Sequence, residues 1–294
     1  MSRTRLIVGC GYLGSRVAAL WRTAGDTVYA VTRSPKRAAA FQCDGWEPIV
    51  ADVLIPESLL DLPAADTVLF AVARGRGSEV PIQRLYVDGL RNVLAALPPP
   101  NQRVIYISST GVYAQDDGGW VDETSPTEPN REGGIASLAA EHALAADARG
   151  PSSIVLRMAG LYGPGRVPRR EDLLSGCPVA DPGDGWLNLI HVADGARVVA
   201  AAAEAALTGV VNVSDGHPVP RRDYLREIAR LLNAPAPDFA QPSPIAESGR
   251  RASSKRVSSR RLVQELGIML DYPDFRAGLA AILGGDANET SATV

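Results

Sequence analysis

The chain has 294 residues, 46% of them hydrophobic, and a formal net charge of −3. A chain of this length buries about 75% of the surface that its unfolded form exposes, so we expect one large domain with a smaller C-terminal lobe. The nearly balanced charge argues against a nucleic-acid-binding surface.

The cysteine pattern and the N-terminus bear on the cellular compartment. Cys10, Cys43 and Cys177 are far apart and lack metal-ligand spacing, so we expect reduced thiols and no metal site. The N-terminal residues lead into a short apolar run that is too brief for a signal peptide. No run approaches the ~18 apolar residues that a membrane span needs. These features predict a soluble, cytoplasmic protein without membrane contact.

Short apolar segments alternate with helical patterns in the first half of the chain. The predicted strands are 6–8, 28–32, 48–50, 67–73, 104–108 and 153–157. The predicted helices are 12–24, 35–44, 80–97 and 132–148. Strands that are apolar on both faces and separated by helices favour right-handed crossovers in a buried parallel sheet. We therefore predict an α/β fold, a Rossmann-type doubly wound parallel sheet.

Beyond residue 158 the alternation is less regular, which predicts a smaller α+β lobe over residues 159–283 that binds substrate. The predicted elements here are a loop at 160–169, a turn at 181–185, strands at 186–192 and 209–213, helices at 193–206, 221–232 and 258–266, and a polar connection at 235–259. Residues 1–158 form the predicted nucleotide-binding domain, and 186–213 contribute to it or border it. The polar tail 284–294 is expected to be disordered.

The most informative stretch is residues 9–14, Gly-Cys-Gly-Tyr-Leu-Gly, directly after the first predicted strand. A strand, a glycine-rich turn and a helix in this order present backbone N–H groups and a helix N-terminus to a phosphate. Gly9 would allow the tight turn, Gly11 the approach of the backbone to a diphosphate, and Gly14 close packing of the helix on the strand. The pattern, with Tyr12 and Leu13, predicts a dinucleotide site, and ordinary turn glycines are the alternative.

The end of the second predicted strand bears on the choice of cofactor. Folds of this kind place an acidic residue there to accept hydrogen bonds from the adenosine ribose. This chain has Arg33 and Ser34 instead, which suit a 2′-phosphate. NADP(H) is therefore favoured over NAD(H), and a surface arginine is the alternative.

Two further strand ends are expected at the cofactor. Asp52, beside Val53, follows the third strand and could accept from the adenine amino group or cap a helix that begins near Pro56. Small residues at the end of the fourth strand leave room for a ribose and a diphosphate, although they equally suit a buried strand end. These small residues are Ala71, Val72 and Ala73.

Four blocks, together with the glycine turn, resemble the extended short-chain dehydrogenase/reductase superfamily and its NAD-dependent epimerase/dehydratase group. The blocks are residues 107–113, 156–166, 188–194 and 211–215. The resemblance covers about residues 5–283 in the family's order. It implies an NAD(P)(H)-binding oxidoreductase, epimerase or dehydratase that acts on a small polar metabolite, such as a nucleotide sugar. It also implies cofactor contacts from Ser108, Met158 and Leu161, and a homodimer formed through helices 80–97 and 132–148.

The resemblance implies a catalytic Ser109, with Thr110 adjacent, that hydrogen-bonds the substrate. The family then uses a Tyr-x-x-x-Lys pair on the following helix, in which the tyrosine transfers a proton and the lysine lowers its pKa. The sequence Leu-Ala-Ala-Glu at 138–141 sets the register and places these positions at Gly133 and Ser137. Neither side chain can replace the tyrosine or the lysine.

Other side chains are weaker candidates for the missing chemistry. Tyr86, Tyr113 and Tyr162 could approach the nicotinamide, and Tyr86 falls where the family often places a relay asparagine. An unpaired tyrosine with its ordinary pKa of ~10 transfers protons poorly at neutral pH. In the second lobe, Arg166 could bind an anionic substrate. His191 lies at a strand-to-helix junction, where a structural role is the alternative to substrate binding.

Two functions follow from these residues. The first is an atypical NADP(H)-dependent reductase, epimerase or dehydratase, which rests on the glycine turn and Ser109. The second is a dinucleotide sensor or regulatory pseudoenzyme, which rests on Gly133 and Ser137. Each predicts a small-molecule ligand.

Overall fold

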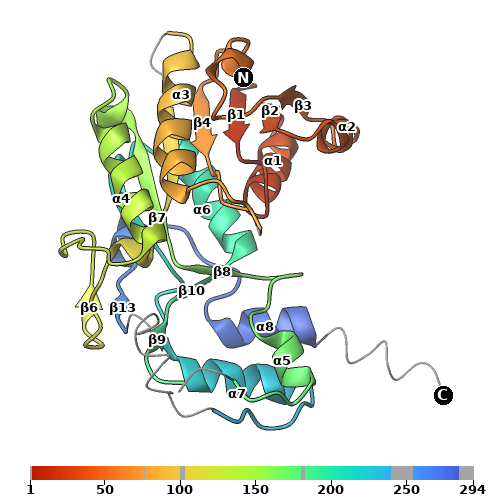
Figure 1. The fold of residues 1–294 in the computed structure, drawn as a ribbon, viewed down its shortest axis with the longest axis vertical. Helices are drawn as coiled ribbons and strands as arrows, with labels where there is room; N and C mark the ends of the chain where they lie inside the picture. The colour runs from red at the N-terminus through yellow and green to blue at the C-terminus, as the bar shows by residue number, and fades with distance from the viewer. Residues whose placement is uncertain (1, 76, 100–102, 180–182, 240–253, 285–294) are drawn as a thin grey trace.

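A seven-stranded sheet dominates the upper part of the molecule in the computed structural model (Figure 1). The structure describes residues 2–75, 77–99, 103–179, 183–239 and 254–284. The strand order is β11-β7-β5-β4-β1-β2-β3, and every pair is parallel. The strands are β1 Thr4–Val8, β2 Thr27–Thr32, β3 Glu47–Val50, β4 Thr67–Phe70, β5 Arg103–Ser109, β7 Ile154–Met158 and β11 Gly209–Val213. The predicted α/β fold with a doubly wound parallel sheet is thereby confirmed.

Helices cover both faces of the sheet because side chains alternate along each strand. Ile7 packs into the core that α1 (Gly14–Thr23), α2 (Pro35–Cys43) and α6 (Val192–Glu204) cover. Leu6 and Val8 pack into the opposite core, beneath α3 (Gly89–Ala96), α4 (Glu132–Ala145) and the 3₁₀ helix η1 (Pro56–Leu59). The central strands are therefore buried on both sides, which explains their continuous apolar sequences, whereas the edge strand β3 is partly exposed.

Several elements differ from the predicted boundaries. The first helix begins at Gly14 rather than at Tyr12, and β4 ends at Phe70, so residues 71–73 leave the sheet as a loop. The predicted helix 80–97 contains a π-helical turn, η2 (Arg84–Asp88), in which the Gly89 N–H donates to the Arg84 carbonyl. Periodicity alone does not reveal such an extra residue within a helix.

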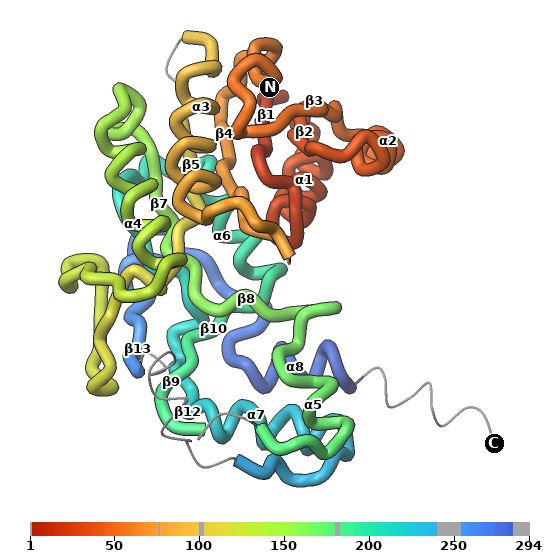
Figure 2. Tube along the Cα trace, in the orientation of Figure 1, coloured from red at the N-terminus to blue at the C-terminus, as the bar shows by residue number. Residues whose placement is uncertain are grey.

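The lower lobe forms a separate apolar core beneath the sheet (Figure 2). The predicted strand 186–192 is split there, because its two halves join different two-stranded sheets: β9 pairs with β12 and β10 with β8. The predicted helix 258–266 is shorter and contains the π-helical η5, and helices α5 and α8 were not predicted. The elements are β8 Gly160–Tyr162, α5 Arg170–Leu174, β9 Trp186–Leu187, β10 Leu189–His191, β12 Val219–Pro220, α7 Arg221–Leu231, η5 Leu262–Leu266 and α8 Phe275–Leu283.

The remaining short elements connect the two parts of the chain. Strands β6 (Trp120–Val121) and β13 (Arg256–Val257) pair in parallel. The 3₁₀ helix η3 (Thr110–Val112) directly follows β5, and the 3₁₀ helix η4 (Gly150–Ser152) directly precedes β7. Residues 285–294 of the predicted tail and 240–253 of the predicted connection lie outside the described residues.

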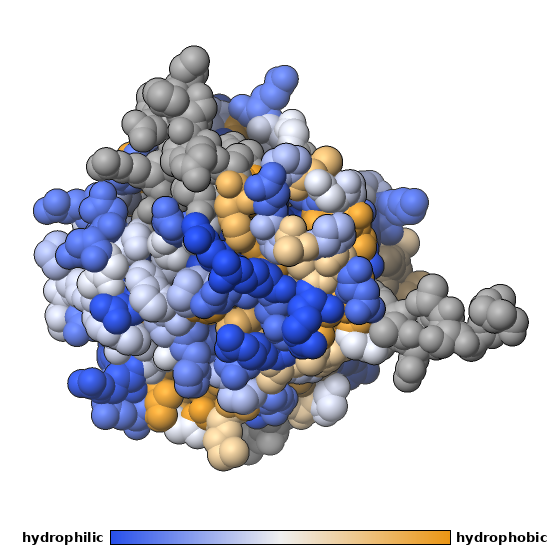
Figure 3. Space-filling view, turned by 90° about the horizontal axis from the view of Figure 1, so that it is seen from below, coloured by the Kyte–Doolittle hydropathy of each residue, from blue (hydrophilic) through white to orange (hydrophobic). Residues whose placement is uncertain are grey.

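The outer face of the lower lobe carries paired charges. Hydrophilic side chains gather in a central band on the face seen from below (Figure 3). Helix α7 contributes Arg226 and Arg230, which lie 3.5 Å from Asp223 and 2.6 Å from Glu227. Exposed pairs of this kind contribute little to stability.

Helices α3 and α4 lie side by side on one face of the sheet (Figure 1). The homodimer expected through residues 80–97 and 132–148 stays a prediction. Within the described ranges, no helix has the length and apolarity required to cross a membrane.

A glycine sets how closely α4 approaches η3. A Cβ atom on Gly134 would lie 2.3 Å from the carbonyl oxygen of Gly111 and 2.8 Å from Cβ of Pro129. The neighbouring Gly133 faces open space, because a Cβ there would meet only Cδ1 of Ile82, at 3.9 Å. Only Gly134 is therefore required by packing.

We expect Gly134→Ala to lower the free energy of unfolding by about 1–3 kcal/mol, because the helix must move away from η3. Gly133→Ala, the matched control, should leave it unchanged or raise it by up to about 1 kcal/mol, since alanine favours helix. Denaturant unfolding measures both values. Equal effects of the two substitutions would contradict this account of α4 docking.

Candidate functional site

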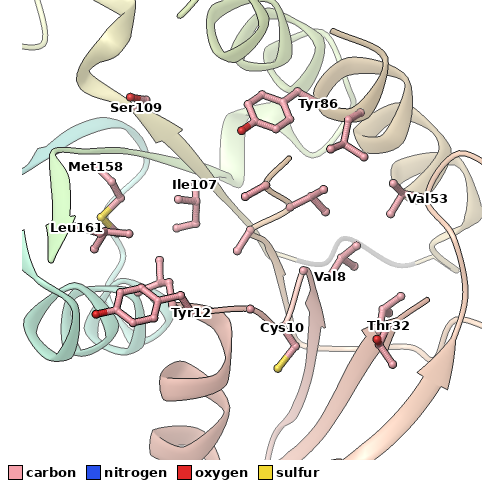
Figure 4. A pocket seen from close by; sticks show the side chains of 18 of the residues that line it. Val8, Cys10, Tyr12, Thr32, Val53, Tyr86, Ile107, Ser109, Met158 and Leu161 are labelled. Atoms are coloured by element: carbon pink, nitrogen blue, oxygen red, sulfur yellow. The ribbon is translucent and has the colours of Figure 1, made fainter. Parts of the chain in front are cut away.

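A cavity of about 670 Å³ lies over the carboxyl ends of the central strands (Figure 4). The chain runs from β1 to β2 and β3 on one side, and then to β4, β5 and β7 on the other. Connections that leave in opposite directions open a crevice between β1 and β4, which is where doubly wound sheets bind ligands. The cavity occupies this crevice.

Close backbone packing shapes the glycine turn at the floor of the cavity. Gly9 has a φ of +95°, and a Cβ atom there would lie 2.5 Å from the carbonyl carbon of Ala71. A Cβ on Gly14 would lie 2.6 Å from the carbonyl oxygen of Gly9. A Cβ on Gly11 would meet nothing within 4 Å. Gly9 and Gly14 are therefore fixed by packing, whereas Gly11 leaves its backbone open to the cavity.

The structure brings most of the predicted site residues together around this cavity. Those that line it are Gly9, Gly11, Tyr12, Leu13, Arg33, Ser34, Asp52, Val53, Ala71, Val72, Ala73, Tyr86, Ser108, Ser109, Met158, Leu161 and Arg166. The others are not among its lining residues: Gly14, Thr110, Tyr113, Tyr162 and His191. Gly14 supports the turn from behind, within α1.

One end of the cavity carries more positive than negative charge. Arg33 is exposed, and its Nη1 lies 3.8 Å from Oδ2 of Asp52. Asp52 also accepts a hydrogen bond from the Leu54 N–H at 2.9 Å. It does not cap the helix near Pro56, because the N-cap position of η1 is Ile55.

Arg37 also lines this end, and the sequence reading missed it. Its guanidinium donates to the Cys10 carbonyl and lies 5.2 Å from the centroid of the Phe41 ring. The sequence carries no signal for Arg37, because Arg33 precedes α2 and the Arg37 side chain is positioned by its hydrogen bond to the distant Cys10 carbonyl. Ser34 caps α2 by accepting from the Arg37 N–H at 3.4 Å, and Arg37 thereby comes to lie beside Arg33.

The other end of the cavity carries hydroxyl groups. Ser109 ends β5, is half-buried, and accepts a hydrogen bond from the Gly111 N–H at 3.0 Å. Ser137 reaches the cavity from α4. Tyr86 lines it from η2, and Figure 4 shows its hydroxyl directed into the open space.

A buried polar network holds the strands beneath Ser109. Arg157 donates to Glu141 through Nη2 at 2.7 Å and through Nε at 3.0 Å, and Ser108 donates to the same carboxylate. Arg157 Nη1 donates to the Tyr113 hydroxyl at 2.8 Å, and that hydroxyl donates to Oδ1 of Asn212 at 2.9 Å. Burial raises the pKa of Tyr113. This arrangement gives Tyr113 a structural role.

Tyr162 and His191 also have structural surroundings. Tyr162 is buried against Gly278 of α8, its hydroxyl lies 3.4 Å from the Asp274 carbonyl, and burial raises its pKa. His191 caps α6 by accepting from the Ala193 N–H at 3.3 Å, and burial lowers its pKa. Both side chains join the lower lobe to the sheet.

Arg166 borders two cavities. It lines the main cavity and a second one of about 600 Å³ beside α5 and the end of α8. Its guanidinium lies 5.3 Å from the centroid of the Tyr12 ring, while that of Arg16 lies 4.3 Å from the same ring. Tyr12 donates to the Pro164 carbonyl at 3.2 Å, which links the glycine turn to the lower lobe.

The profile of the NAD dependent epimerase/dehydratase family matches residues 6–214. Protein YeeZ of Escherichia coli K12 is 30% identical over 279 residues, which cover 91% of this chain and 96% of YeeZ. The chain therefore belongs to the NAD-dependent epimerase/dehydratase family, and the predicted family resemblance is confirmed.

Two further proteins illustrate the range of similarity. The 3-diazoavenalumate denitrifying reductase of a Streptomyces species is 26% identical over 304 residues, covering 93% of this chain and 98% of that reductase. The enzyme WbmG of Bordetella bronchiseptica, solved in complex with NAD, is 19% identical with a TM-score of 0.81, covering 98% of this chain and 95% of WbmG. WbmG shares the fold.

We expect Gly9→Ala to lower the free energy of unfolding by about 2 kcal/mol or more, because it combines an unfavourable φ with a backbone clash. Gly11→Ala should change it by less than about 0.5 kcal/mol, because its Cβ enters open space. Thermal and denaturant unfolding distinguish the two. A stable Gly9→Ala variant would show that the β1 and β4 loops do not pack as described.

Proposed function

We propose that this chain is an NADP(H)-dependent oxidoreductase of the extended short-chain dehydrogenase/reductase type that acts on a small polar carbonyl or hydroxyl compound. One observation carries the proposal: a single cavity joins the open Gly11 backbone, the Arg33 and Arg37 guanidinium groups, and the hydroxyl of Ser109. The positively charged end would take the 2′-phosphate of the adenosine, the open Gly11 turn the diphosphate, and the hydroxyl end the nicotinamide and the substrate.

The residues of the cavity fit such a cofactor. The absence of a Cβ atom at Gly11 leaves room at the turn, where backbone N–H groups would hold the diphosphate. Arg33, Ser34 and Arg37 would hold the 2′-phosphate, because two guanidinium groups there face one carboxylate, that of Asp52. When bound, the nicotinamide ring supplies or accepts a hydride.

Ser109 would orient the substrate. Its hydroxyl is held by the Gly111 N–H and stays half-exposed at the cavity, so it can donate to a substrate oxygen. Arg166 lines the same cavity, with its guanidinium 5.3 Å from the centroid of the Tyr12 ring, and would suit an anionic part of the substrate.

A dinucleotide-binding sensor is the second candidate. The observation that favours it is the presence of Gly133 and Ser137 on α4, where the resemblance expects a tyrosine and a lysine. Tight NADPH binding without turnover of carbonyl compounds or nucleotide sugars would support the sensor. Turnover of NADPH with any of them supports the enzyme.

The preference for NADPH is tested by one matched pair of variants. Arg33→Ala should raise the Kd for NADPH about 10- to 100-fold and leave that for NADH unchanged, since a hydrogen bond to a charged group contributes about 1.5–3 kcal/mol. Lys36→Ala removes one positive charge from an exposed position that does not line the cavity, and should change neither value. Calorimetric titration of the unmodified protein and of both variants with each coenzyme measures all six constants. Equal binding of both coenzymes by the unmodified protein would contradict the proposed preference.

The role of Ser109 is tested by NADPH oxidation with a panel of carbonyl compounds. We expect Ser109→Ala to lower kcat/KM about 10- to 100-fold with unchanged NADPH affinity, since it removes one substrate hydrogen bond. Thr110→Val, which alters a neighbouring side chain outside the cavity lining, should retain activity. Full activity of Ser109→Ala would remove this residue from the proposed site.

A further inference from the structure

The cavity has few side chains that could move a proton. Among its described lining residues, those that titrate and are not arginines are Cys10, Tyr12, Asp52 and Tyr86. The first three belong to the cofactor end. Burial raises the pKa of the Cys10 thiol to about 12 within the glycine turn, the Tyr12 hydroxyl donates to Pro164, and Asp52 faces Arg33. Tyr86 is the one that remains, and it lines the same cavity as Ser109.

An unusual piece of backbone presents Tyr86. It lies in the π-helical turn η2, between residues 82–83 and helix α3. The inserted residue rotates the following side chains relative to a regular α-helix, and such turns occur frequently at functional sites. The turn packs against α4, so Tyr86 faces the helix that carries Gly133 and Ser137. Its hydroxyl points into the cavity (Figure 4).

The surroundings of Tyr86 keep its hydroxyl protonated. Burial raises its pKa, and the Arg74 backbone and guanidinium oppose the shift. From β5, the buried Tyr106 belongs to the apolar core against which Tyr86 packs, and burial raises the pKa of Tyr106 as well. Arg74 itself lies 3.3 Å from Glu132, at the start of α4. A tyrosine that stays neutral at physiological pH cannot act as a base, and it gives up its proton only to a stronger base, such as the oxyanion that forms when a carbonyl carbon receives a hydride.

We propose that Tyr86 is a catalytic residue of this chain, whose hydroxyl gives a proton to the substrate oxygen beside Ser109 and so replaces a side chain on α4. The proposal rests on the oxidoreductase function proposed above. Tyr86 lies on η2, whereas the resemblance places the family's proton-transferring tyrosine on α4.

The proton balance of the step is simple. The O–H bond of Tyr86 breaks as a new O–H bond forms at the substrate oxygen, which gains negative charge when its carbon receives the hydride. Water that enters the open cavity then returns a proton to Oη of Tyr86. One solvent proton is consumed for each carbonyl group reduced, and Ser109 holds the oxygen in place.

The test compares three tyrosine variants of the full chain. Tyr86→Phe keeps the ring and should lower kcat for carbonyl reduction about 10²- to 10⁴-fold, while NADPH affinity and thermal stability stay unchanged. Tyr29→Phe, on β2 and outside the cavity lining, is the matched control and should retain full activity. Tyr86→His should have a higher kcat than Tyr86→Phe, because a protonated imidazole can donate a proton. Its kcat should fall as the pH rises through ~6.5, the ordinary pKa of histidine.

The unmodified protein provides a further readout. Its reduction rate should stay level through neutral pH and fall only above pH ~10, as Tyr86 ionises. The absorbance of ionised tyrosine can be followed against pH in the cofactor-free protein. Tyr86→Phe should lack one group that titrates above pH ~10 in the unmodified chain.

The possible results separate the two proposals. Turnover by the unmodified protein that survives in Tyr86→Phe overturns the role of Tyr86 and leaves the oxidoreductase function standing. A Tyr86→His variant with the unmodified pH profile also overturns it. NADPH binding without any turnover overturns both the role of Tyr86 and the enzyme, and it favours the sensor.

Discussion

The close approach of two backbone segments determines the rest of the site. The turn after β1 lies so near the loop after β4 that no Cβ atom fits at Gly9, where Ala71 would be 2.5 Å away. This contact lies at the point where the sheet's connections diverge, so it closes the floor of the crevice while Gly11 stays open above it. The open backbone at Gly11, the arginines at the β2–α2 junction and the hydroxyl of Ser109 at the end of β5 all line the cavity above this floor.

The hydroxyl end of the site has two parts, a buried polar network beneath Ser109 and the turn η2 that carries Tyr86. Beneath Ser109, the buried Arg157–Glu141 pair and the hydroxyl of Tyr113 satisfy one another, and loss of one partner would leave a buried charge uncompensated. Tyr86, which lines the same cavity as Ser109, is carried by a π-helical turn whose side-chain directions differ from those of a regular helix. The proposed proton donor therefore lies on η2, a different element from α4, where the resemblance places the family's tyrosine.

Local sequence patterns predicted much of the fold and the glycine turn of the site, but not every residue that lines the cavity. Strands of the sheet follow from apolar runs, and the glycine turn from its spacing, because both depend on neighbouring residues. Arg37 and the divided strand at 186–191 were not predictable, since each depends on contacts with distant segments. Tyr113 and Tyr162 show the same limit: their sequence positions suggested the site, but burial places them in support of it.

The central claim is that the crevice at the β1 turn holds a dinucleotide by its diphosphate. A crystal structure of the protein grown with NADPH tests it most directly. The account predicts diphosphate oxygens that accept hydrogen bonds from backbone N–H groups of residues 11–13, with the 2′-phosphate against Arg33 or Arg37. A dinucleotide bound elsewhere, or bound here with its phosphates away from the glycine turn, would contradict it.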